Sequence, residues 1–137
     1  MLRAETKSRA RALQILYAWE LQGGGSIPMV VTGVARLTGP EPLILDRAEA
    51  LAAAVVSQIE IIDSELAQAA ENWRMSRIAA VERNILRLGI HELRRGDVPP
   101  KVAIDEAVKL AHWFGGTRAP GFVNGILDGI AHSLGRL

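Results

Sequence analysis

Apolar residues at helical spacing follow one another along most of this 137-residue chain, and clusters of glycine and proline separate the runs. Positions that recur every third or fourth residue lie on one face of an α-helix, so each run predicts an amphipathic helix. The apolar residues are mainly Ala, Leu, Ile and Val, and only 4% of the chain is aromatic, which favours closely packed helices. The sequence therefore predicts an all-α fold, a single domain built as a bundle of about seven helices.

The glycine and proline clusters also predict where the helices begin and end. Gly23 to Gly25 end the first helix, because three glycines in succession disfavour helical backbone. A turn with Pro40 at residues 39–42 precedes a long amphipathic helix, and a connector at 73–76 places Ser76 as the N-cap of the following helix. These signals place bounds on six of the predicted helices, at about residues 5–22, 27–38, 45–66, 77–95, 100–114 and 117–134.

The first predicted helix begins with positively charged residues, although a helix N-terminus favours negative ones. Its opening residues contain one anion, Glu5, and four cations, Arg3, Lys7, Arg9 and Arg11. The N-terminus of a helix carries partial positive charge and unpaired N–H groups. We therefore expect an anion to compensate these cations.

The cations of this helix fall on two of its sides. At about 100° per residue, Lys7, Arg11 and Gln14 share one face, roughly opposite the apolar positions of the helix. Arg9 falls on the inner side, where a carboxylate within the fold is a candidate partner. The side chains of Lys7, Arg11 and Gln14 are spaced to contact the phosphates of a nucleic acid. The alternative interpretation is that this basic face is only exposed to solvent.

Charge is unevenly distributed along the chain, although the net charge is only +1. Residues 1–11 hold four cations and one anion, residues 41–71 hold one cation and seven anions, and residues 74–95 hold six cations and two anions. The basic blocks predict an electropositive face rather than a uniformly basic surface.

Two carboxylates fall inside or beside the apolar arc of the helix predicted from residue 77. Arg83, Arg87 and Arg94 project from the opposite side of that helix, whereas Glu82 and Glu92 do not. A carboxylate that faces a core is unfavourable unless it is paired, so each needs a partner within the fold or across an interface. We interpret Glu92 as structural and leave the role of Glu82 open.

The sequence lacks the residue patterns of common catalytic and metal sites. It contains no cysteine, which excludes disulfides and thiolate zinc sites and fits a cytoplasmic protein. The three histidines stand on separate helical stretches without metal-ligand spacing, and we interpret them as surface residues. No phosphate-loop, hydrolase or dinucleotide-binding motif occurs, and no membrane span or signal peptide is expected. We therefore expect no enzyme activity, no cofactor and no metal.

Ordered blocks of sequence cover both ends of the chain. They are RARALQILYAW at residues 9–19, ERNILRLGIHEL at 82–93, DVPPKVAIDEA at 97–107, FGG at 114–116 and FVNGILD at 122–128. Together they resemble the NusB family of transcription antitermination factors, and their order makes the resemblance more specific than any single motif. Residues 23–75 match that family only in length and helical pattern.

The resemblance implies an all-α fold of two small packed helical subdomains, over about residues 1–75 and 76–137. It implies binding rather than catalysis, in a complex with NusE, a ribosomal protein of the small subunit, that recognises boxA-type single-stranded RNA. With RNA polymerase and other Nus factors, such a complex promotes processive transcription of ribosomal RNA operons. The implied RNA-binding residues are Lys7, Arg9, Arg11, Gln14 and Phe122, and the implied partner-binding residues are Tyr17 and Glu82.

Two segments depart from the family pattern. The loop at residues 116–121 lacks the acidic residues usual there, so Arg118 becomes a candidate phosphate contact, while Pro120 and Gly121 change the loop. Glu5 and Thr6 stand where relatives often carry arginine, which implies weaker intrinsic RNA affinity and more binding through the partner.

Two other functions are compatible with the sequence. One is an RNA-binding domain related to that of ribosomal RNA cytosine methyltransferases, although those enzymes also carry a large Rossmann-like domain. The other is a helical protein-interaction module without RNA binding, whose basic face is only solvated. The residues also leave open whether the free protein is a monomer or a homodimer.

Overall fold

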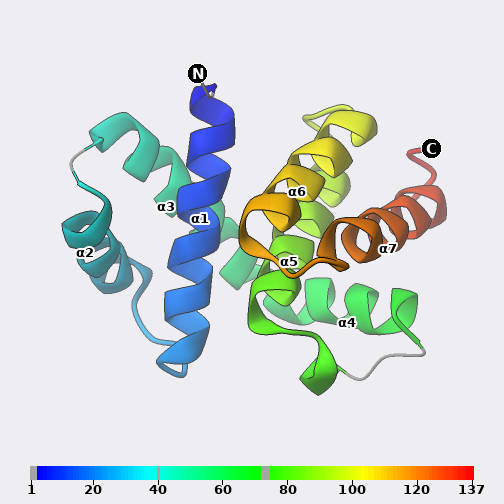
Figure 1. The fold of residues 1–137 in the computed structure, drawn as a ribbon, viewed down its shortest axis with the longest axis horizontal. Helices are drawn as coiled ribbons and strands as arrows, with labels where there is room; N and C mark the ends of the chain where they lie inside the picture. The colour runs from blue at the N-terminus through cyan, green and yellow to red at the C-terminus, as the bar shows by residue number, and fades with distance from the viewer. Residues whose placement is uncertain (1–2, 40, 72–74) are drawn as a thin grey trace. The chain divides into compact units, whose positions relative to one another are not determined.

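The computed structural model describes residues 3–39, 41–71 and 75–137, and the regular structure within these ranges is helical (Figure 1). The helices are α1 (Ala4–Leu21), α2 (Ile27–Thr38), α3 (Pro42–Ser57), α4 (Ile59–Ala69), the 3₁₀ turn η1 (Met75–Arg77), α5 (Ala80–Arg95), α6 (Pro100–Phe114) and α7 (Ala119–Ser133). The prediction of an all-α fold with about seven helices is confirmed. Pro40 of the first predicted turn and residues 73–74 of the predicted connector lie outside the described ranges.

The helices form two compact units that divide between Ser57 and Gln58. The first unit contains α1, α2 and α3, and the second contains α4 to α7. This division comes earlier in the chain than the subdomain boundary predicted near residue 75. The reason is that α4 packs against α5 and α7 and therefore belongs with them.

The prediction of one long helix over residues 45–66 is wrong. Gln58, with φ −118° and ψ 21°, interrupts it and separates α3 from α4. Apolar periodicity does not reveal the break, because Ile62 and Leu66 keep helical spacing from Val55 across it. Neither glycine nor proline marks the position, so the sequence contains no local signal that the helix ends there.

In the first unit, α1 packs against α2 and α3 through a row of buried apolar residues along one side of the helix. The row includes Ala12, Leu13, Ile15 and Leu16. The C-terminal end of α1 is fixed by Trp19, whose indole Nε1 donates a hydrogen bond to the carbonyl oxygen of Gly25 at 3.1 Å. The glycines between them all have positive φ, which explains why α1 ends where the sequence predicted.

For the later helices, proline positions predict the first helical residue better than candidate polar N-cap residues do. α2 tolerates Pro28 because the residue lies in the first turn, and α6 begins at Pro100, as predicted. The helix predicted from residue 77 begins instead at Ala80, and Ser76 lies in η1. Ser76 is therefore not the N-cap; that position is Ala79, which has no side-chain hydrogen bond to cap the helix.

The central helix of the second unit is α5, because α4, α6 and α7 all pack against it. Its residues Ile85, Leu86 and Ile90 are fully buried. Gly89 permits the close approach of α7, since a Cβ at this position would lie 2.6 Å from Cδ1 of Leu127. Real Cβ atoms do not come so close, so the contact depends on the missing side chain.

We expect Gly89→Ala to lower the free energy of unfolding by about 1–3 kcal/mol, because the added methyl overpacks the contact with Leu127. Urea denaturation followed by circular dichroism measures the change. Gly125→Ala on α7 is the matched control, because a Cβ there meets open space and the substitution raises helix propensity. Equal stability of the two variants would contradict this account of the α5–α7 contact.

Candidate nucleic-acid interface

One side of α1 carries two cations and an amide within reach of one another. Arg11 donates a hydrogen bond from Nη1 to Oε1 of Gln14 at 3.1 Å. Lys7 Nζ and Arg11 Nη2 each lie 3.8 Å from an oxygen of the Glu41 carboxylate. The structure therefore brings together Lys7, Arg11 and Gln14, three of the α1 residues that the resemblance implies in RNA binding.

Sequence reasoning did not identify Glu41 as a member of this site. The rule that helix N-termini favour negative charge required an anion near the cations, but it gave no position for one. Glu41 immediately precedes α3, and its carbonyl oxygen accepts a hydrogen bond from the Leu45 N–H at 2.9 Å. The side chains of Lys7, Arg11 and Glu41 are 42%, 24% and 40% exposed, so solvent and ligands reach all three.

The other two candidates on α1 differ in exposure. Arg9 is half-buried, and it already makes an interaction within the structure. Tyr17 is 38% exposed, which leaves part of its ring accessible to a binding partner. Lys7, Arg9 and Arg11 are all half-buried, so exposure alone does not rank the α1 cations implied in RNA binding.

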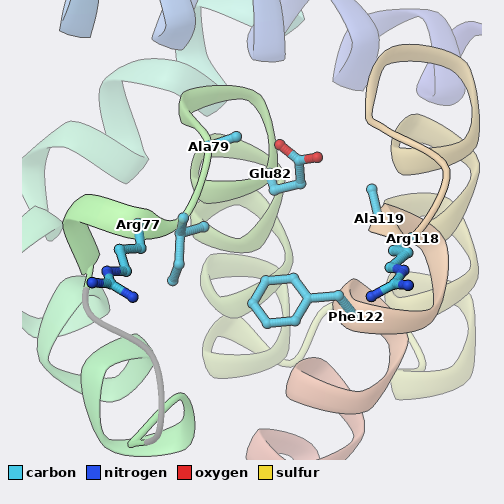
Figure 2. A pocket seen from close by; sticks show the side chains of 7 residues that line it. Arg77, Ala79, Glu82, Arg118, Ala119 and Phe122 are labelled. Atoms are coloured by element: carbon cyan, nitrogen blue, oxygen red, sulfur yellow. The ribbon is translucent and has the colours of Figure 1, made fainter.

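The second unit contains a pocket of about 440 Å³ next to the start of α7 (Figure 2). It is lined by Arg77, Ile78, Ala79, Glu82, Arg118, Ala119 and Phe122. The Phe122 ring supplies an aromatic wall, the two arginines supply positive charge, and Glu82 supplies a carboxylate. The candidates Glu82, Arg118 and Phe122, which are far apart in the sequence, therefore share one pocket, and Arg77 is a lining residue that sequence reasoning missed.

Glu82 has a partner within the fold, because its Oε1 accepts a hydrogen bond from the Gly116 N–H at 3.2 Å. This contact connects α5 to the loop that carries Arg118. The loop also needs Gly115, where a Cβ would lie 2.6 Å from the Cβ of Ala119. Pro120 lies in the first turn of α7, so it starts that helix rather than distorting it.

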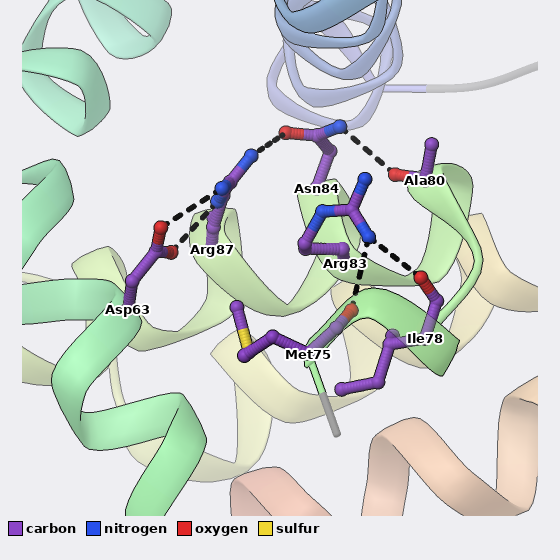
Figure 3. A network of polar contacts seen from close by, with 7 residues as sticks. All are labelled: Asp63, Met75, Ile78, Ala80, Arg83, Asn84 and Arg87. Carbon is purple, nitrogen blue, oxygen red and sulfur yellow. Dashed lines mark hydrogen bonds and ion pairs between the residues drawn. The ribbon is translucent and has the colours of Figure 1, made fainter. Parts of the chain in front are cut away.

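A polar network holds α5 and the segment before it in place (Figure 3). Arg87 is only 6% exposed and donates hydrogen bonds to both carboxylate oxygens of Asp63 on α4, at 2.8 and 2.9 Å. Its Nη1 also donates to Oδ1 of Asn84 at 3.0 Å. The prediction that Arg87 projects away from the core is therefore wrong, because a paired guanidinium can be buried.

The same helix anchors one wall of the pocket. Arg83 donates from Nη1 to the carbonyl oxygens of Ile78, at 2.6 Å, and Met75, at 3.2 Å. These bonds fix η1 and the residue after it, which carry the pocket residues Arg77 and Ile78. Arg94 pairs with Glu65 of α4, and Glu92 is buried and engaged in an interaction, consistent with a structural role.

The histidines differ in their surroundings. His112 and His132 are exposed, as predicted, whereas His91 is half-buried with its Nε2 atom buried and without a hydrogen-bond partner. Burial, reinforced by the nearby Arg95, lowers the pKa of His91, so its ring stays neutral more readily than an exposed one. Across the described ranges, no group of three or more His, Cys, Asp or Glu side chains is arranged to hold a metal ion.

No helix within the described part of the chain is both long and apolar enough to cross a membrane. What the structure does present is a small all-helical protein with exposed cations on one helix and an arginine-flanked aromatic pocket in a second unit.

The chain belongs to the NusB family, whose family model matches residues 6–132. A transcription antitermination protein NusB from Sorangium cellulosum is 42% identical over 135 residues, which cover 98% of this chain and 96% of that relative. A second NusB protein, from Saccharopolyspora erythraea, is 39% identical over 131 residues, covering 93% and 86%. The family is one of transcription antitermination factors, which confirms the prediction that the chain is not an enzyme.

Solved structures show the same fold. NusB of T. maritima matches with a TM-score of 0.83 and 28% identity, covering 96% of this chain and 93% of that chain. A chain in the crystal structure of antitermination factors NusB and NusE in complex with dsRNA matches with a TM-score of 0.84 and 29% identity, covering 97% and 99%. The resemblance read from the sequence blocks is therefore confirmed for the fold and for the family.

Proposed function

We propose that this chain is an antitermination factor that binds boxA-type single-stranded RNA together with NusE and promotes processive transcription of ribosomal RNA operons. The observation that carries the proposal is the row on α1, where Lys7, Arg11 and Gln14 lie together on a solvent-accessible side. The similar chain crystallised with NusE and dsRNA supports both classes of partner. Contacts with RNA polymerase and other Nus factors are part of the same proposal.

The α1 row supplies the electrostatic part of RNA binding. Lys7 and Arg11 are one helical turn apart, about 6 Å along the axis, so both can meet phosphates of one strand. The amide of Gln14 adds donors and an acceptor for sugar or base groups beside Arg11. Arg9, being half-buried and already engaged, acts in this proposal mainly by adding positive potential to α1.

The pocket in the second unit supplies a place for one unstacked base. Single-stranded RNA is commonly recognised by stacking its bases on aromatic rings, and Phe122 offers such a ring. Arg118 is exposed at the start of α7, where it can pair with the phosphate next to that base. Arg77 adds a second cation to the lining of the pocket.

NusE is proposed to contact Tyr17 and Glu82. The exposed part of the Tyr17 ring offers apolar surface with a polar tip, a combination that suits protein interfaces. Only one oxygen of Glu82 receives the Gly116 N–H, so the carboxylate retains capacity to accept bonds from a basic ribosomal protein.

We expect the double variant Lys7→Ala and Arg11→Ala to weaken boxA binding by the complex with NusE about tenfold or more at low salt, because two phosphate contacts are lost. Fluorescence anisotropy over a salt series should also show the log–log slope reduced by about 1.4. The matched control is Arg36→Ala with Arg47→Ala, which removes the same charge from exposed positions on α2 and α3. Equal affinity of the two double variants would exclude the α1 row from the RNA site.

We expect Phe122→Leu to weaken binding of single-stranded RNA by about fivefold or more, because stacking on the ring is lost while apolar volume is kept. Double-stranded RNA of the same sequence should bind Phe122→Leu and parent alike, since paired bases cannot enter the pocket. Phe122→Tyr keeps the ring and serves as the control. An equal loss for both forms of RNA would show that Phe122 does not hold an unstacked base.

We expect Glu82→Gln to weaken NusE binding, measured by isothermal titration calorimetry, while the melting temperature stays close to that of the parent. The amide oxygen can still accept the Gly116 N–H, so this variant removes the charge without releasing the loop. Glu60→Gln, on the exposed side of α4, removes the same charge elsewhere in the second unit. Unchanged NusE affinity of Glu82→Gln would assign Glu82 to loop structure alone.

A further inference from the structure

The carboxylate of Glu41 lies beside two cations of α1. Its two carboxylate oxygens face different partners, Oε2 toward Lys7 Nζ and Oε1 toward Arg11 Nη2, each at 3.8 Å. Phosphate and carboxylate present the same kind of anionic oxygen to such cations. The backbone of Glu41 is held by the first turn of α3, so the carboxylate stays near the row whether or not a ligand is bound.

We propose that Glu41 is an intramolecular competitor of RNA phosphate that lowers the affinity of the α1 row for polyanions. The inference rests on the proposed function in one respect, namely that Lys7 and Arg11 contact RNA. Its direction follows from Coulomb's law, because a negative charge a few ångströms from the cations repels an approaching phosphate.

The geometry shows a contact that a ligand can displace. Both ion pairs are longer than the usual 2.7–2.9 Å of a charge-assisted hydrogen bond. All three side chains are partly exposed, and ion pairs between exposed groups contribute little to stability. A phosphate can therefore take over Lys7 and Arg11 without disturbing the packing of α1 on α3, which depends on buried apolar residues.

The test is Glu41→Gln in the full chain, bound to NusE and titrated with a boxA-type leader RNA. We expect RNA affinity to rise about fivefold at low salt and the gain to shrink toward parity at high salt, as screening weakens the repulsion. Asp46→Asn is the matched control, because it removes one charge from α3 at an exposed residue that makes no ion pair in the described structure. An unchanged or lower affinity of Glu41→Gln relative to Asp46→Asn overturns the inference.

A second comparison shows whether Glu41 acts through the α1 cations. In the background of Lys7→Ala and Arg11→Ala, Glu41→Gln should give no gain, because the competitor has lost the groups it occupies. A gain that persists in this background overturns the inference. Thermal unfolding of Glu41→Gln should match that of the parent, which separates competition from a change in folding.

A measurement without leader RNA separates this inference from the proposed function. On phosphocellulose eluted with a salt gradient, Glu41→Gln should elute later than Asp46→Asn, because the freed cations bind immobilised phosphate more strongly. If the parent complex binds no leader RNA, the proposed function fails, and the order of elution still decides the role of Glu41. Identical elution of the two variants overturns it.

Discussion

The buried guanidinium of Arg87 and the carboxylate of Asp63 form the contact on which the second unit depends. A buried positive charge is tolerated only when it is paired and hydrogen-bonded, so α5 can keep Arg87 in its core only while α4 lies against it. This requirement explains why α4 belongs with α5 and not with α3, which precedes it in the chain. Asn84, which accepts a hydrogen bond from Arg87 and donates one to the carbonyl of Ala80, continues the network toward the start of α5.

At that end of α5, two side chains organise the pocket. Arg83 binds the carbonyls of Met75 and Ile78, while Glu82 binds the N–H of Gly116 on the opposite side. No polar side chain caps the helix, so its orientation is set by these contacts with neighbouring segments. The pocket therefore forms around the first turn of α5, and residues of η1, α5 and α7 contribute to its lining.

Most helices and their buried faces could be predicted from the sequence, because apolar spacing and glycine or proline clusters mark them directly. The interruption at Gln58 could not, since the apolar pattern continues through it. Nor could the burial of Arg87, because a helical wheel places a side chain on a face without showing which carboxylate from another helix will cover it. An ion pair between residues far apart in the sequence depends on the tertiary structure, and local sequence patterns do not reveal it.

The same limit applies to the candidate site. The sequence analysis named Lys7, Arg11, Glu82 and Phe122 as candidates, but Glu41 and Arg77 depend on turns whose course only the fold defines. The role of Glu41 changes the electrostatics of the α1 row: two outer cations and one carboxylate leave an excess of about one positive charge there. Two phosphate contacts, made by Lys7 and Arg11 in place of Glu41, support a salt slope of only about 1.4 on single-stranded RNA. Any steeper dependence must therefore come from arginines outside this row or from the partner protein, which makes high affinity a property of the complex rather than of α1 alone.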